Sequence, residues 1–158
     1  MIDVRLLLQE ENGAQEAVDF ELPAGTFPEL PLRSEVHVKG RLLRVQEGIS
    51  LILDEVSTSY EADCVVCQKS LSLVLNTVPS EWLFYEKKPR NFDDPNELVL
   101  LDMKYFTLDP TDVLRQEIVL NMSDAPRCPK ACGSFMDASA KEAPKGVKGL
   151  AQLKDLIS

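Results

Sequence analysis

The chain has 158 residues with 26 acidic and 17 Lys or Arg residues, a formal net charge of −9. This length supports one core, or one core plus a small metal lobe, and argues against a two-domain enzyme. The charge argues against nonspecific binding of nucleic acid, because that affinity comes mostly from Lys and Arg at phosphates. Residues 1–60 hold 11 acids against 5 bases, whereas residues 137–158 hold 3 against 4. Any RNA contact is therefore expected to be local.

The apolar content indicates a soluble protein with no membrane partner. No run approaches the ~18 apolar residues that a helix needs to cross a bilayer. Residues 1–10 lack a basic leader with a clean apolar stretch and a cleavage site, so we expect a cytoplasmic protein whose thiols stay reduced.

The first elements are expected to be strands. Residues 1–32 contain Pro23, Pro28 and Pro31, which forbid a continuous helix and favour a strand, a turn and an extended lead-in, with residues 6–8 joining the core. Apolar residues then alternate from Val36 to Leu42 and resume after a turn at Glu47-Gly48, which predicts a β-hairpin.

The second strand of this hairpin is expected to be long and to run straight into Cys64. Alternating leucines from Leu71 to Leu75 predict another strand paired with it, so that the segment Cys64–Cys67 forms the connection. The run Trp82–Tyr85 is expected to be strand or core, in preference to a base-stacking platform.

The second half of the chain contains one expected helix. Residues 86–97 are polar and broken by prolines, which predicts a loop, and Glu97–Met103 is expected to be a short buried strand. A helix is predicted over 109–122, with Asp109 as its cap and Pro110 at its first position. Its apolar face recurs at Leu114, Ile118 and Met122.

All four cysteines fall in two tight pairs, Cys64 with Cys67 and Cys128 with Cys132. Two such pairs can hold one tetrahedral Zn²⁺, and four sulfur ligands describe a closed structural site that performs no chemistry. Pro129 and Gly133 would shape the second turn. The pairs are 60 residues apart, longer than in common zinc modules. Two local disulfides, buried thiols or a redox pair therefore remain alternatives.

No catalytic constellation is evident, so we expect neither an enzyme nor a small-molecule substrate. His37 is the sole histidine and is expected to be a half-exposed strand residue. The chain has no phosphate-binding glycine loop, no serine elbow and no His-Glu metalloprotease motif.

Together these patterns predict an α+β fold, an antiparallel β-meander or partial barrel with one principal helix and a small zinc-ribbon-like site of four cysteines. Residues 1–133 are expected to form a single domain that includes the metal site. Residues 134–158 are expected to be a flexible tail, with a short helix near its end.

Five segments follow one another along the chain: Tyr60–Cys67, Phe106–Asp109, Val113–Leu120, Pro126–Gly133 and Leu150–Leu156. In their order and spacing they resemble the bacterial YceD-like family, the large ribosomal RNA subunit accumulation proteins. The resemblance spans about residues 33–157. Family members often carry a longer, cysteine-richer second region, so which family cysteines Cys128 and Cys132 represent is open.

The resemblance implies a cytoplasmic, non-enzymatic factor needed for accumulation of large-subunit (23S) rRNA. We expect a zinc-stapled binding module whose partner is precursor large-subunit rRNA or an assembly protein. The alternatives are a thiol–disulfide redox protein and an acidic adaptor that binds protein. The expected RNA or partner contacts are Lys87, Lys88, Arg90, Lys145 and Lys148.

Overall fold

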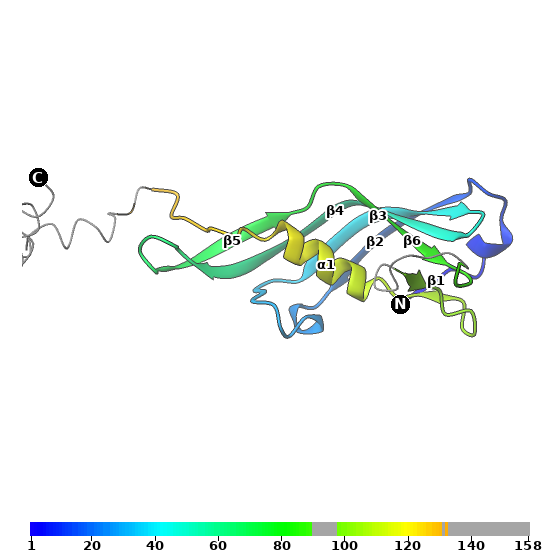
Figure 1. Cartoon of the computed structure of the whole chain (residues 1–158), viewed down its shortest axis with the longest axis horizontal. Coiled ribbons are helices and arrows are strands. Elements are labelled where there is room, and N and C mark those ends of the chain that lie inside the picture. Colours follow the sequence, from blue (N-terminus) through cyan, green and yellow to red (C-terminus); the bar gives the residue numbers. More distant parts are fainter. Residues whose placement is uncertain (90–97, 131, 133–158) are drawn as a thin grey trace, which may run out of the picture. The chain divides into compact units, whose positions relative to one another are not determined.

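The fold is seen in a computed structural model that describes residues 1–89, 98–130 and 132 (Figure 1). Contacts divide the chain into two compact units. The first comprises Met1–Ala62 and Ser72–Asp124. The second comprises Asp63–Leu71 and the chain from Ala125 onward. The elements are β1 (Ile2–Asp3), η1 (Leu7–Gln9), β2 (Gln15–Leu22), η2 (Ala24–Thr26), β3 (Val36–Val45), β4 (Gly48–Asp63), β5 (Ser70–Asn76), β6 (Ser80–Tyr85), β7 (Val99–Leu100), β8 (Thr107–Leu108) and α1 (Thr111–Asn121).

Six strands form one sheet, with the order β2-β3-β4-β6-β7 and with β5 also paired to β4. The β2–β3, β3–β4 and β4–β6 pairings are antiparallel, and the short β6–β7 pairing is parallel. β2 and β7 end the order without pairing with each other, so the sheet is open. β1 and β8 form a separate antiparallel pair. The predicted α+β fold, with antiparallel strands and one principal helix, is confirmed.

β4 is paired along both edges. On one edge it meets β3, and on the other it meets β6 and then β5. Gly48 lies opposite Tyr85 in the β4–β6 ladder. Between β5 and β6, Thr77 continues this register, because its N–H donates to the Val56 carbonyl at 3.0 Å and its Oγ1 accepts from the Val56 N–H at 3.1 Å. A side chain thus supplies the ladder bond where strand geometry is interrupted.

α1 packs on the sheet through apolar side chains and one buried acid. Val113, Leu114 and Ile118 are fully buried in the core cluster, as the predicted helical face requires. Glu117 is only 5% exposed and accepts a hydrogen bond of 2.6 Å from Trp82 Nε1 on β6. This bond satisfies two polar groups that would be costly to bury alone. The expected core role of the aromatic run is also confirmed, since Phe84 is fully buried.

Asp109 bonds to the start of α1 as the sequence predicts, but the helix spans Thr111–Asn121 rather than 109–122, so Pro110 precedes the helix instead of occupying its first position. Asp109 Oδ1 accepts from the Thr111 N–H at 3.0 Å and from the Thr111 hydroxyl at 2.6 Å. The hydroxyl bond is the main reason that the pKa of Asp109 lies below its ordinary value.

Two expectations are corrected. Of residues 6–8, which were expected to join the core, Leu7 is buried and Leu8 packs against the core, but Leu6 is 76% exposed. The strand expected over Glu97–Met103 is two residues long, with Leu100 half-exposed at the end of the sheet order and Leu101 buried. The strand expected within residues 1–32 is β2, which has eight residues. The expected tail, 134–158, lies outside the described residues.

A substitution at Gly48 tests how closely β4 and β6 approach each other. A methyl group on Gly48 would overlap the carbonyl oxygen of Phe84, so we expect Gly48→Ala to lower the free energy of unfolding by about 3 kcal/mol. Gly25→Ala is the matched control, because nothing lies within 4 Å of a methyl group placed there. It should change stability by less than about 0.5 kcal/mol. Urea denaturation measures both, and equal effects would contradict the close approach.

Asp109 gives a pH-dependent prediction. Asp109→Ala should lower the free energy of unfolding by about 1 kcal/mol, and Asp109→Asn, which keeps an acceptor, by less. Because the folded-state pKa is depressed, the carboxylate's contribution is complete above the unfolded value of 3.8 and is lost as pH falls through the folded value. The advantage of the native protein over Asp109→Asn should therefore shrink in urea titrations taken from about pH 7 to about pH 3. A constant difference would argue against the cap.

Candidate metal centre

The first cysteine pair lies in a tight turn that closes the β4–β5 hairpin. Cys64 follows the last residue of β4, and its N–H donates to the Lys69 carbonyl at 2.9 Å. The Gln68 N–H donates a hydrogen bond to the Cys64 carbonyl at 2.9 Å, and Gln68 has a left-handed φ of 58°. A positive φ was expected at Gly133, beside the second cysteine pair, whereas the structure shows one at Gln68, directly after the first pair. The corresponding expectation for Gly133 falls outside the described residues.

The second pair follows α1 and is held beside the first by the backbone. The Val65 N–H donates to the Pro126 carbonyl at 2.9 Å, which joins the first turn to the segment that leads into Cys128. Sequence reasoning missed this bond, because nothing in the identity of Val65 or Pro126 reports which distant partner their backbone will meet.

The four sulfur atoms converge. All four Sγ atoms lie within 4.8 Å of one another, with 3.7 Å between Cys64 and Cys132 and 3.5 Å between Cys67 and Cys128. A tetrahedron with metal–sulfur bonds of about 2.3 Å has edges of about 3.8 Å. All four cysteines are free thiols. The cluster therefore has the ligand number and the spacing to hold one metal ion, and the predicted convergence of the pairs is confirmed.

The electrostatics of the cluster show why a cation suits it. The N–H groups of Cys67 and then Val66 lower the pKa of Cys64 to about 6. Hydrogen bonds with the Cys67 and Cys64 sulfurs raise the pKa of Cys128 to about 12. Burial, followed by the bond with Cys64, raises the pKa of Cys132. The Cys64 thiolate is thus favoured while Cys128 and Cys132 resist ionising, and a bound cation would stabilise all four thiolates together.

The cysteine cluster is distinct within the described part of the chain. Over residues 1–89, 98–130 and 132, no other group of three or more His, Cys, Asp or Glu side chains is arranged to hold a metal ion. His37 lies in β3, is 48% exposed and bonds through Nδ1 to Glu21 at 2.9 Å, as expected of a half-exposed strand residue.

The predicted basic contacts are only partly described. Lys87 and Lys88 are exposed directly after β6. They share a shallow depression with Glu47 and Glu86, so acids flank them. Arg90, Lys145 and Lys148 lie outside the described residues.

Comparison with protein-family models, with curated proteins and with solved structures finds no match to this chain. Among the helices of the described residues, none is both long and apolar enough to span a membrane.

Removing one ligand should remove the metal and the stability together. We expect the native chain, purified under reducing conditions, to carry one metal ion, and Cys64→Ser and Cys132→Ser to carry none. Because metal binding is coupled to folding, each should lose at least about 2 kcal/mol of unfolding free energy. Lys130→Ser, inside the second pair, keeps four thiols and should retain both properties. Elemental analysis and urea denaturation provide the measurements. Full metal loss with unchanged stability would contradict a structural role.

Proposed function

We propose that the metal is zinc and that its role is structural. Four thiolates in a tetrahedral arrangement suit Zn²⁺ and leave no open position for water or substrate. Cys64 is only 1% exposed, which favours a closed site. Elemental analysis of the native chain tests the identity. Zinc is colourless, so an iron-containing preparation with visible thiolate absorption would overturn this assignment.

We further propose that the protein is a non-enzymatic, cytoplasmic ribosome biogenesis factor, a zinc-stapled binding module that supports accumulation or processing of large-subunit (23S) rRNA. The observation that carries the proposal is the convergence of two distant cysteine pairs, which lie in segments that resemble the YceD-like family. A structural metal site would fix the shape of the surrounding surface, and the residues of that surface would bind the partner.

Other residues of the resembling segments also have architectural roles. Tyr60 is 3% exposed, and its hydroxyl accepts from the Ser123 N–H at 3.0 Å just beyond α1. Asp109 caps the same helix at its other end. The resembling segments thus hold a scaffold together, which favours a binding function over a catalytic one.

The redox alternative is less well supported by the cluster. A thiol–disulfide carrier needs one cysteine pair that is free to open and close, whereas here each pair has the other within 4.8 Å. The acidic adaptor differs from the leading proposal only in its partner, and the experiment below separates them.

Charge limits how RNA would be bound. Lys87 and Lys88 are flanked by Glu47 and Glu86. If both lysines contact phosphates, the log of RNA affinity should fall with the log of salt concentration with a slope no steeper than about −2. A steep salt dependence would therefore require the basic residues outside the described part of the chain. A flat dependence would indicate an assembly protein as the partner.

Sedimentation of cell extract tests the proposal. We expect the native protein to travel with large-subunit precursors, and depletion to lower mature 23S rRNA. Cys64→Ser should restore neither property. Lys87→Gln with Lys88→Gln should reduce sedimentation with precursors if RNA is the partner, whereas Lys104→Gln, an exposed lysine elsewhere, is the control. Absence of both co-sedimentation and any rRNA change would overturn the proposal.

A further inference from the structure

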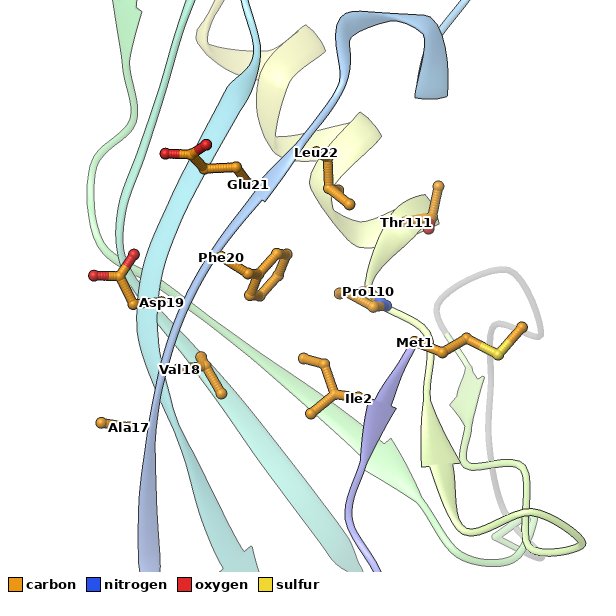
Figure 2. Close-up of a pocket in the computed structure, with 10 residues that line it drawn as sticks. All are labelled: Met1, Ile2, Ala17, Val18, Asp19, Phe20, Glu21, Leu22, Pro110 and Thr111. Atoms are coloured by element: carbon orange, nitrogen blue, oxygen red, sulfur yellow. The ribbon is translucent and has the colours of Figure 1, made fainter.

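A groove of about 470 Å³ runs beside β2. Figure 2 shows Val18, Phe20 and Leu22 directed across it toward Ile2 and Pro110. The three β2 side chains and Ile2 are partly buried against the core, so the groove has an apolar floor that the protein leaves partly uncovered.

β2 also presents an unpaired backbone edge. It stands at the end of the sheet order, and within the described residues it pairs only with β3. The Arg44 N–H donates to the Ala14 carbonyl at 2.8 Å, which sets the phase of the antiparallel ladder. Because bonded and non-bonded pairs alternate, the N–H and C=O groups of Gln15, Ala17, Asp19 and Glu21 point away from β3. This edge is a template for another strand.

The charge of the exposed β2 side chains indicates which kind of added strand would bind. β2 contains Glu16, Asp19 and Glu21 and no basic residue. Asp19 and Glu21 also line the groove, and in Figure 2 their side chains point to the side of the strand opposite those of Val18, Phe20 and Leu22. Glu21 remains 58% exposed although it pairs with His37. Across the ladder Asp19 lies opposite Lys39 and Glu21 opposite His37, so each acid already has one neighbour on β3. A second copy of β2 would still place acids beside acids along the open edge, which is unfavourable.

We propose that β2 binds an extended peptide in which apolar residues alternate with Lys or Arg, by strand addition to its open edge. The period of two places all apolar side chains of the peptide on the groove side, beside Val18, Phe20 and Leu22, and all its basic side chains beside Asp19 and Glu21. Main-chain hydrogen bonds give affinity, and the alternation gives specificity. The inference goes beyond the proposed function and does not depend on the cysteine cluster.

Two blocked octapeptides test the proposal with the full-length, metal-loaded chain. One alternates Val with Lys and the other Val with Glu. We expect the Val/Lys peptide to bind with a dissociation constant below about 1 mM and the Val/Glu peptide at least about tenfold more weakly. The bound Val/Lys peptide should slow amide hydrogen exchange at Ala17, Asp19 and Glu21, which NMR reports residue by residue.

Two variants separate this mode from misfolding. Asp19→Lys combined with Glu21→Lys should reverse the preference, so that the Val/Glu peptide binds more tightly, a gain that a damaged fold cannot produce. Ala17→Pro removes one outward N–H and leaves the β3 ladder intact, so it should weaken binding by about threefold to tenfold. Equal affinity for both peptides, no slowing along β2 at about 1 mM peptide, or dimerisation through β2 would overturn the proposal.

Discussion

The structure depends on one strand that is paired along both edges. β4 has 16 residues, and its partners are β3 on one side and β6 followed by β5 on the other. The register set at Gly48 and Tyr85 holds at Val56 and Thr77. A one-residue slip would turn every inward side chain outward, so the core itself enforces this register.

The metal centre combines local and long-range constraints. Each cysteine pair is shaped locally, the first by the left-handed Gln68 and the bond that returns to Cys64. Bringing the pairs together closes a long loop, which has an entropic cost. The Val65 bond to Pro126 offsets only part of that cost. The pKa values of Cys128 and Cys132 are raised within the cluster, so a bound cation would favour their ionisation. If a metal binds here, its binding would be coupled to the ordering of this segment.

The elements predicted correctly from the sequence are those that depend on local periodicity and on the chemistry of single residues. The β3–β4 hairpin, the strand after the first cysteines, the Asp109 cap and the buried face of α1 all follow from local patterns. The strand predicted within residues 1–32 is β2, in which Val18, Phe20 and Leu22 alternate with Asp19 and Glu21. The burial of Glu117 depends on Trp82, 35 positions away, and no local signal reports such a pairing.

Charge is distributed unevenly over the sheet, and this bears on how one small acidic chain can meet two kinds of partner. The acids of β2 stand at one end of the strand order, whereas Lys87 and Lys88 follow β6, on the other side of β4. A polyanion approaching the lysines is separated by the intervening strands from the carboxylates of β2, although Glu47 and Glu86 lie beside the lysines. A basic peptide on β2 meets no lysine or arginine on that strand. The proposed phosphate contact lies beside the β3–β4 turn and the proposed peptide groove lies along β2, so the two sites share no lining residue.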